Sequence, residues 1–468
     1  MQFLVCRRAA VSLVSAAILF FAVGQNAMAS TVVVTPPNTT PCKSLPSYPT
    51  ISQAVASVPV GSTIYVCPGT YAEQVVITKK LTITGVAANG LAGTTASGAN
   101  NPIIASPAGG VAVNTSDLYQ NPNGEPTAAQ VLIQTPPNLL STPISVTISN
   151  ITVDGSNNGI SGCGTDLVGF YFQNASGTLN HVTARYQELA PADFGCQDGL
   201  AIYVQSGYGT GGTAVVTVEN ASVHDYDKNG ITADGSGTVA TIVDNYVVGI
   251  GATPLIAQNG IQMSYGARGS INGNIVTDDV YINPSDCSLT TNPYCYSASG
   301  ILLYDSGGAS GTPVTINSNT ISNTQGAIVT YTDGVESADY NNLTSNKITT
   351  VPAIVSSVAG TVPLDGIDLC SNNNTATSNT VFNASGAGVH LDSSCFEPGG
   401  ASTGVGTATN NTVNEACAGV ILGNSGGTSS GTGSYNVVET TATGNSCPAG
   451  SPNSPKAMGK ARPQPKRR

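Results

Sequence analysis

A glycine-led strand motif recurs along the chain and constrains its fold more than any other feature. In each copy a small or turn residue precedes Gly, and an apolar-x-apolar pair follows. The copies are Val168-Gly169-Phe170, Asp198-Gly199-Leu200, Asn229-Gly230-Ile231, Asn259-Gly260-Ile261, Ser299-Gly300-Ile301, Asp365-Gly366-Ile367, Ala387-Gly388-Val389 and Ala418-Gly419-Val420, with Gly326-Ala327-Ile328 a looser one. The glycines are mostly 22 to 31 residues apart. One such unit cannot bury its own apolar face, so the units must stack as a solenoid.

A second motif, Asn followed closely by Val or Ile, lies between the glycine-led copies. Examples are Asn150-Ile151, Asn180-His181-Val182, Asn245-Tyr246-Val247, Asn274-Ile275, Asn319-Thr320-Ile321, Asn346-Lys347-Ile348 and Asn411-Thr412-Val413. Gly and Asn tolerate positive φ, and alternate residues of a strand point to one face. We therefore expect sharp turns at the Gly and Asn positions and short strands with inward apolar residues.

The low charge of the chain agrees with strands and turns. Only 9% of its residues are charged, against about 25% in ordinary soluble domains. Setting aside the basic residues at the two ends leaves seven basic and 26 acidic residues between Ser30 and Pro455, a net charge of -19. An acidic body repels nucleic acid, which we exclude as a partner, and polyanionic sugars unless a cation intervenes.

The first residues resemble an export signal. Arg7 and Arg8 precede an apolar stretch of 15 residues, Ala9 to Val23, and Ala27-Met28-Ala29 supplies a small-x-small cleavage pattern. This pattern predicts a signal peptide over 1–29 and an extracellular or periplasmic protein. The stretch is short for a membrane span, so we expect no transmembrane segment.

Cysteine spacing agrees with export. Apart from Cys6, ten cysteines remain, an even number in a compartment where disulfides persist. Nearest-neighbour pairing would join successive units of the repeat and close one local loop, although sequence alone does not prove it. The expected pairs are Cys42–Cys67, Cys163–Cys196, Cys287–Cys295, Cys370–Cys395 and Cys417–Cys447.

The start of the mature chain resembles the pectin-lyase-like superfamily. The residues that carry the resemblance are Ile51-Ser52-Gln53-Ala54-Val55, Gly61 to Val66, Pro68-Gly69-Thr70-Tyr71 and Leu81 to Gly85. The resemblance implies an all-β fold, a right-handed parallel β-helix whose first turn is capped by a short helix over Ser52 to Val58. The same scaffold hosts lyases, hydrolases, esterases, epimerases and inert surface proteins, so the fold does not select a reaction.

We divide the chain by these signals. We expect a signal peptide at 1–29, a Pro/Thr-rich lead at 30–41, the cap and first turns at 42–90 and a loop-rich excursion at 91–144. The main solenoid follows at 145–447, and a disordered basic tail occupies 448–468. We expect a monomer.

One outward patch could carry chemistry. If the apolar residues of each glycine-led strand face inward, Asp368, His390 and Asp392 share an exposed patch beside Tyr304 and Tyr331. The resemblance makes this the sugar-binding face, with Tyr203 in the same outward row. Asp368 and Asp392 would lie diagonally, with Cα atoms roughly 8 Å apart, as suits an inverting acid/base pair, and His390 could orient a carboxyl group. The alternatives are a plain polar face and sugar binding without chemistry.

A second constellation surrounds the turn from His224 to Asn229. Asp225 and Asp227 offer oxygen ligands for Ca²⁺ at turn spacing, and Lys228 or Arg185 could serve as the base of a uronate lyase. A salt-linked turn that caps an Asn ladder is the favoured alternative. Apart from this possible Ca²⁺ ion, we expect no cofactor.

The known catalytic signatures of the superfamily are incomplete in this chain. Pro363 to Asp368 resembles the strand entry of polygalacturonases, but the next unit has Ala387-Gly388 where a paired Asp-Asp should follow. Gln197-Asp198 resembles a pectin methylesterase fragment without its partner stretch. We therefore predict an exported β-helix protein that binds polysaccharide, and keep a polysaccharide hydrolase or lyase as the alternative.

Overall fold

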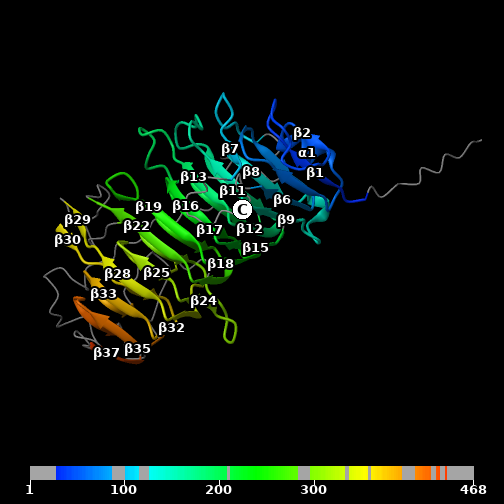
Figure 1. Ribbon diagram of the computed structural model, residues 1–468. Helices are drawn as coiled ribbons and strands as arrows, with labels where there is room; N and C mark the ends of the chain where they lie inside the picture. Colours follow the sequence, from blue (N-terminus) through cyan, green and yellow to red (C-terminus); the bar gives the residue numbers. More distant parts are fainter. Residues whose placement is uncertain are drawn as a thin grey trace, which may run out of the picture.

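The computed structural model shows stacked parallel strands along almost the whole described chain (Figure 1). It describes residues 28–86, 101–114, 126–207, 211–282, 296–332, 337–356, 360–392, 406–422, 428–432 and 438–439. The expected signal peptide up to residue 27 and the basic tail lie outside these ranges.

Two sheets form the walls of the helix, a 24-stranded sheet and a 12-stranded sheet. From residue 145 onward a typical turn contributes two strands to the first sheet, called the long sheet below, and one to the second, called the site sheet. Every pairing between named strands of these two sheets is parallel in the described residues. Like strands therefore lie one above another, turn after turn.

The long sheet takes its strands from three groups. The first turns supply β1 (Thr31–Val34), β2 (Ser47–Tyr48), β3 (Thr63–Val66), β4 (Thr70–Ala72), β6 (Leu81–Gly85) and β7 (Ile103–Ala105). The first strands of later turns are β9 (Ser145–Ser149), β12 (Ser176–Asn180), β15 (Ala214–Glu219), β18 (Thr238–Val243), β21 (Arg268–Asn272), β24 (Val314–Asn317), β27 (Asn341–Thr344), β32 (Asn374–Thr377), β35 (Gly406–Asn414) and β37 (Thr428–Thr432). The second strands are β10 (Thr152–Asp154), β13 (Thr183–Gln187), β16 (Ser222–Tyr226), β19 (Tyr246–Thr253), β22 (Ile275–Tyr281), β25 (Thr320–Ser322), β28 (Lys347–Val351) and β33 (Thr380–Ala384).

The site sheet contains the glycine-led strands. Its members are β5 (Val75–Ile77), β8 (Thr127–Gln134), β11 (Asp166–Gln173), β14 (Leu200–Gln205), β17 (Asn229–Asp234), β20 (Asn259–Ser264), β23 (Ser299–Tyr304), β26 (Ile328–Tyr331), β31 (Ile367–Cys370), β34 (Ala387–Leu391), β36 (Ala418–Leu422) and β38 (Val438–Glu439). A separate antiparallel hairpin joins β29 (Ile354–Ser356) to β30 (Gly360–Val362). β1 pairs with β3, and β7 and β8 join the sheets, so parts of the expected lead and excursion belong to the solenoid.

Helix α1 (Ile51–Ser57) and the 3-10 helix η1 (Pro137–Leu139) are the helical elements of the described residues. Thr50 caps α1, since its side chain accepts a hydrogen bond from the Gln53 backbone N–H. Ile51, Ala54 and Val55 are buried on α1, which lies beside the first strands in Figure 1.

The glycine of each motif is required for space. A Cβ at Gly230 would lie 2.7 Å from a Val247 methyl group, and one at Gly388 would lie 2.4 Å from a Val413 methyl group. Those valines follow the Asn of the second motif, so the two motifs pack against each other inside the helix. Gly230 and Gly388 do not have positive φ. The expectation of sharp turns with positive φ was therefore wrong at Gly230 and Gly388, whereas Gly199 has a φ of 82°.

The Asn motif forms a hydrogen-bonded ladder inside one corner. Asn319 Nδ2 donates to Asn346 Oδ1 at 2.9 Å and to the Ile271 carbonyl at 2.9 Å, while the Asn319 backbone N–H donates to the same Asn346 Oδ1 at 3.0 Å. The pattern repeats over Asn245, Asn274, Asn319, Asn346, Asn379 and Asn411. Asn150 and Asn180 do not take part in the ladder. The residue that precedes a ladder Asn has positive φ, as at Asp244 and Ser318.

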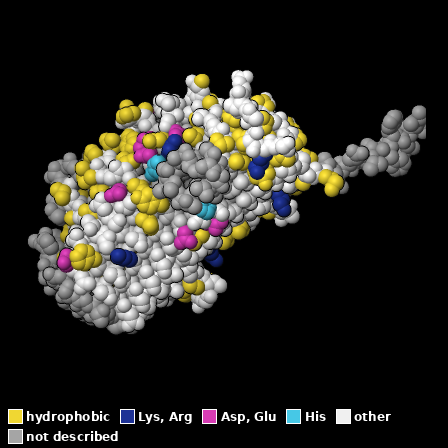
Figure 2. Space-filling model, in the orientation of Figure 1, with side chains coloured by type: hydrophobic (Ala, Val, Ile, Leu, Met, Phe, Trp, Pro, Cys, Tyr) yellow, Lys and Arg dark blue, Asp and Glu magenta, His cyan; other side chains and the backbone are white. Residues whose placement is uncertain are grey.

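The outer face of the long sheet carries hydroxyl groups where other proteins carry charge. One outward column, read in register along the first strands, is Thr31, Thr63, Thr82, Thr147, Thr178, Thr217, Thr241, Ser270, Thr315, Asn342, Thr375 and Thr407. Thr suits a half-buried strand surface. Figure 2 accordingly shows few charged side chains on the face in view.

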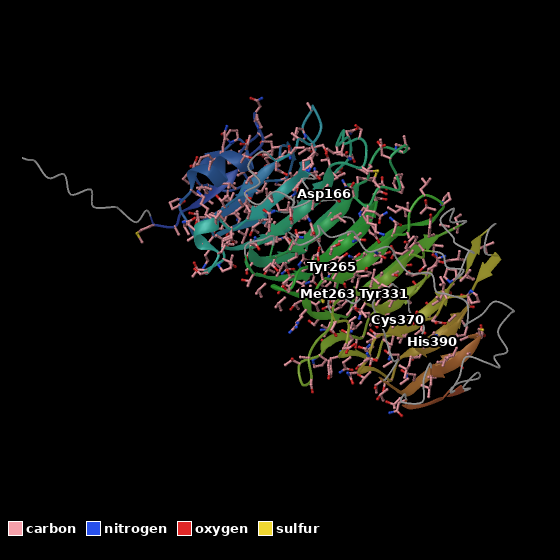
Figure 3. The ribbon with its side chains drawn as sticks, turned by 180° about the vertical axis from the view of Figure 1, so that it is seen from behind. Asp166, Met263, Tyr265, Tyr331, Cys370 and His390 are labelled. Atoms are coloured by element: carbon pink, nitrogen blue, oxygen red, sulfur yellow. A yellow bond between two sulfur atoms is a disulfide. The ribbon has the colours of Figure 1, made fainter. Side chains whose placement is uncertain are left out.

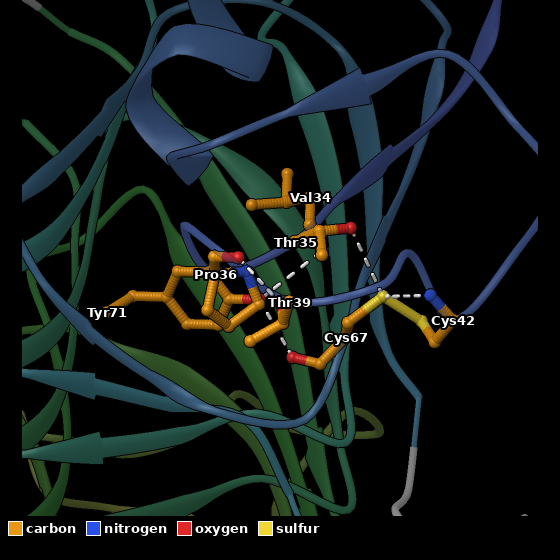
Figure 4. The surroundings of a disulfide bond; sticks show 7 residues. All are labelled: Val34, Thr35, Pro36, Thr39, Cys42, Cys67 and Tyr71. Carbon is orange, nitrogen blue, oxygen red and sulfur yellow. Dashed lines mark hydrogen bonds between the residues drawn. A yellow bond between two sulfur atoms is a disulfide. The ribbon is translucent and has the colours of Figure 1, made fainter.

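Two expected disulfides are present in the described residues. Cys42–Cys67 joins the loop after β1 to the end of β3, and Cys163–Cys196 joins two adjacent turns. Around the first bond, Tyr71 donates its hydroxyl hydrogen to the Cys67 carbonyl at 2.8 Å (Figure 4). Cys370 and Cys417 are also disulfide-bonded, while their expected partners, and both Cys287 and Cys295, lie outside the described residues.

Candidate functional site

The site sheet brings Asp368, His390 and Asp392 together, as expected. β31 and β34 pair in parallel, with Asp368 directly opposite His390. Asp392 follows the end of β34, and its backbone N–H donates to the Leu369 carbonyl. Figure 3 shows His390 and Cys370 near one end of this sheet, with Tyr331 and Tyr265 on the preceding turns.

His390 lies between two carboxylates. Its Nδ1 is 3.0 Å from Asp365 Oδ2, and its Nε2 is 3.8 Å from Asp392 Oδ1. Asp365 is itself held, because its Oδ1 accepts the Ala387 backbone N–H at 2.6 Å. Asp365 therefore orients the imidazole ring with Nε2 facing Asp392, which is how a carboxylate positions a histidine for proton transfer.

Asp368 and Asp392 converge on the sulfur of Cys370. Asp368 Oδ1 is 3.4 Å from Cys370 Sγ, and Asp392 Oδ2 is 3.6 Å from it. Because Cys370 is disulfide-bonded, its sulfur has no proton to donate. One oxygen of each carboxylate lies within 4.8 Å of the other. This spacing is shorter than the roughly 6.5–9.5 Å of inverting pairs, so the inverting geometry expected from the sequence is not present.

The expected exposure of this patch was wrong. His390 is 2% exposed, Asp392 1% and Asp368 6%. A position on the outward side of a strand does not ensure contact with solvent. Burying three carboxylates beside one histidine is costly unless protons or a cation balance the charge.

Tyrosine side chains continue the same face on the preceding turns. Tyr304 and Tyr331 lie opposite each other, with ring centroids 5.3 Å apart, and Tyr265 lies 5.4 Å from Tyr304. Tyr304 and Tyr265 are half-buried and Tyr331 is buried. Cys370 is the next residue in register after Tyr331. The tyrosines therefore lie next to the cluster of Asp365, Asp368, His390 and Asp392.

Tyr203 does not belong to the row that contains Tyr304. It pairs with Tyr171 and Thr232, and its ring stacks on Tyr171 at 4.8 Å. The expectation aligned Gly199 with the other motif glycines, but Ala201 occupies that column. The strand is thus displaced by two residues from the expected register, and Ala201, expected on the outside, lies in the core.

The second constellation splits into a buried part and a surface part. Lys228 is fully buried and donates from Nζ to the Ala257 carbonyl at 2.5 Å. It is therefore not placed to act as a base on a glycan at the surface. Arg185 is partly exposed and pairs through Nε with Asp154 Oδ2 at 2.8 Å. His224 Nδ1 lies 2.6 Å from Asp225 Oδ2.

Two acidic groups near Lys228 have raised pKa values. Burial, together with the charges of Asp198 and Glu188, raises the pKa of Asp227 to about 8, while Lys228 opposes this shift. Burial likewise raises the pKa of Asp279 well above its ordinary value, although a hydrogen bond from the Tyr226 hydroxyl at 2.6 Å opposes it. With a pKa of about 8, the Asp227 carboxyl group is largely protonated near neutral pH.

The geometry does not support Ca²⁺ at Asp225 and Asp227. Asp225 faces His224 at the surface, whereas Asp227 is fully buried. In the described ranges, the groups of three candidate ligands whose atoms lie within 4.8 Å of one another are Asp365/Asp368/His390 and Asp368/Cys370/Asp392. Only the first of these is a plausible metal-ligand set, because the sulfur of Cys370 is in a disulfide.

The sequence interpretation missed Asp365, Tyr265 and a glutamine corner. Asp365 preceded a motif glycine and was read only as part of a strand entry. Tyr265 precedes Gly266, and its φ of 51° turns it beside Tyr304. Gln258 Nε2 donates to the Tyr226 and Asp227 carbonyls, and Gln325 satisfies the Tyr281 backbone in the same way. The Gln residues carry no spacing signal that distinguishes them from surface residues.

The parallel pairing of both sheets around one apolar core decides the architecture. The fold is a parallel β-helix. A DFA-IIIase from Arthrobacter chlorophenolicus A6 has similar architecture, with a TM-score of 0.42, 15% identity and coverage of 87% of this chain and 90% of that chain. The periplasmic alginate epimerase AlgG gives a TM-score of 0.39, 11% identity and coverage of 81% and 76%. PfbA, a surface adhesin of Streptococcus pneumoniae, gives a TM-score of 0.43 and 13% identity, with coverage of 84% of this chain and 88% of that chain.

No family model matches the sequence, and no curated protein matches it significantly. The similarity to the solved structures concerns the fold, and no role of any residue is taken from it. In the described ranges no helix is both long and apolar enough to span a membrane.

Proposed function

We propose that the protein binds polysaccharide on the face formed by Tyr265, Tyr304 and Tyr331. The supporting observation is the contact of these three rings on successive turns, with two of them half-buried. A ring of this kind offers an apolar surface for the C–H face of a sugar and a hydroxyl for its polar groups.

We also propose that the protein acts outside the cytoplasm. The Cys42–Cys67 and Cys163–Cys196 bonds support this location, because disulfides persist mainly in oxidising compartments. The signal-like N-terminus supports the same location.

Isothermal titration with soluble glycans tests the binding proposal. We expect Tyr304→Ala to weaken binding about tenfold, since the ring contact is lost, and Tyr304→Phe to retain it. Tyr246→Ala is the matched control, because Tyr246 is 39% exposed on another face of the helix. Equal affinities for wild type and Tyr304→Ala would contradict the proposal.

Hydrolysis is the second candidate, and the position of His390 between Asp365 and Asp392 favours it. At this close spacing one carboxylic acid would protonate the departing glycosidic oxygen while the other carboxylate bonds to the anomeric carbon, and water would then displace that carboxylate, its oxygen ending on the anomeric carbon. Release of reducing ends by wild type, but not by Asp392→Asn, would support it. The burial of all three groups makes binding the better-supported function.

A further inference from the structure

Tyr186 is an unusual residue for its place in the fold. It lies in a column of residues with positive φ at the end of the second strands, where the other members on successive turns are short or polar. That column contains Tyr186, Asp225, Asp278, Asn323, Thr350, Asn383 and Glu415, with φ between 48° and 68°. Asn and Asp tolerate this conformation, whereas a bulky aromatic residue is strained there. Burial offsets little of that strain, since Tyr186 is 38% exposed.

The preceding residue and a residue on the next turn lie against the Tyr186 ring. The Arg185 guanidinium lies 5.6 Å from the ring centroid, and the His224 ring meets it edge-on at 6.3 Å with an interplanar angle of 81°. Arg185 is anchored by Asp154, and His224 by Asp225. Gly155 lies against the Tyr186 backbone, where a Cβ would come within 2.3 Å of the Tyr186 carbonyl oxygen. The ring is therefore exposed and in contact with two neighbouring side chains, and its backbone packs against Gly155.

Hydrogen-bonding groups around the ring remain available in the described part of the chain. Arg185 uses Nε for Asp154, and neither of its terminal NH₂ groups has a partner there; the same holds for His224 Nε2 and the Tyr186 hydroxyl. Glu188 adds a carboxyl group, whose pKa is raised by burial and by the charge of Asp225. The site thus combines donors, acceptors and one aromatic face.

The charge of the site selects among ligands. Asp154, Asp225 and Glu188 surround a single Arg and one His, so an anionic ligand would meet more negative than positive charge. A neutral sugar suits the site better, because each hydroxyl can donate to a carboxylate and accept from Arg185 or His224 while the C–H face covers the ring.

We infer that Tyr186, Arg185 and His224 form a second site, which binds a neutral hexose unit of a glycan. β13 and β16 belong to the long sheet, whereas Tyr304 and Tyr331 belong to the site sheet. Tyr186 and Tyr304 are three turns apart, about 14 Å along the axis. This inference does not depend on the Tyr304 face.

Affinity electrophoresis in gels containing laminarin, dextran or galactomannan tests the inference, with polygalacturonate as the anionic counterpart. Tyr186→Ala should weaken binding of a neutral glycan about tenfold, whereas Tyr186→Phe should keep most of it. Tyr246→Ala, with 39% exposure against 38% for Tyr186, should migrate like wild type. The same loss should appear when Tyr186→Ala is added to Tyr304→Ala.

A second variant separates binding from folding. Tyr186→Asn suits the positive φ, so it should melt at or above the wild-type temperature and still lose the neutral glycan. Unchanged binding by Tyr186→Ala or Tyr186→Asn would overturn the inference, as would retardation only by polygalacturonate. If all binding disappears in Tyr304→Ala alone, this second site is refuted and the proposed function stands. If binding survives Tyr304→Ala but not Tyr186→Ala, the second site stands and the proposed Tyr304 face is refuted.

Discussion

Asp365 holds His390 through an Nδ1 to Oδ2 contact of 3.0 Å while its other oxygen accepts the Ala387 backbone N–H. One buried carboxylate thus supports both a turn and a histidine. We expect Asp365→Ala to lower the free energy of unfolding by about 2–3 kcal/mol, because it leaves the N–H and the imidazole without their partner. Chemical denaturation measures the change. Asp244→Asn, at an exposed position with a φ of 54°, should stay within about 0.5 kcal/mol.

The asparagine ladder gives a prediction about local stability. Asn319→Ala removes the bonds to Asn346, to the Ile271 carbonyl and to the Asn274 backbone. Several buried groups lose partners, so we expect a loss of about 2–5 kcal/mol. Each turn of a solenoid contacts only its neighbours, and hydrogen exchange should therefore quicken first in β21 to β25.

The control for that experiment is Asn317→Ala. Asn317 is exposed two residues away and does not join the ladder. Exchange rates that rise equally in both variants would show that the ladder contributes no more than an ordinary surface amide.

The buried Asp227 predicts a dependence of stability on pH. Its folded pKa of about 8 exceeds the ordinary value of 3.8, so between these values the folded state holds a proton that the unfolded state has lost. The contribution is fully present below about pH 4, falls as pH rises and is lost above pH 8, with a slope of at most about 1.4 kcal/mol per pH unit. Asp279 and Glu188, whose pKa values are also raised, act in the same direction.

Melting temperatures between pH 5 and pH 9 check this prediction. Asp227→Asn mimics the protonated carboxyl group, so its melting temperature should fall less than that of wild type across this range. Parallel curves for the two proteins would contradict the raised pKa.

Much of the architecture could be predicted from the sequence, because a solenoid repeats one local solution. Motif glycines such as Gly230 and Gly388 and the ladder from Asn245 to Asn411 mark successive turns, and the disulfides at Cys42–Cys67 and Cys163–Cys196 follow that spacing. The proximity of Asp368, His390 and Asp392 followed from the same register. Periodicity therefore predicts which residues are neighbours.

The remaining properties depend on the insertions and on local offsets in strand register. Because the register at Gly199 differs from the expected one, Ala201 lies in the core and Tyr203 lies in the column of Tyr171 and Thr232. Burial of Lys228 and His390 depends on what lies over each strand, and outward-facing periodicity contains no information on that cover. The contacts of Asp365 with His390 and the Ala387 backbone depend on the turn geometry at Asp365, which the neighbouring residues in the sequence do not predict.

The Cys42–Cys67 bond predicts where the helix frays first. The bond closes a 25-residue separation between the loop after β1 and the end of β3, which in the chain-entropy account contributes about 3 kcal/mol. We expect Cys42→Ser/Cys67→Ser to increase exchange in β1 and β3, with little change beyond β9. An equal increase along the whole helix would indicate a single cooperative unit.

Hydrogen exchange of the glycan-saturated protein tests the binding face most directly. Soluble glycan that binds wild type should slow exchange in peptides containing Tyr265, Tyr304 and Tyr331, and this protection should vanish in Tyr304→Ala but persist in Tyr246→Ala. Protection confined to other turns, or unchanged in Tyr304→Ala, would contradict the assignment of this face to polysaccharide.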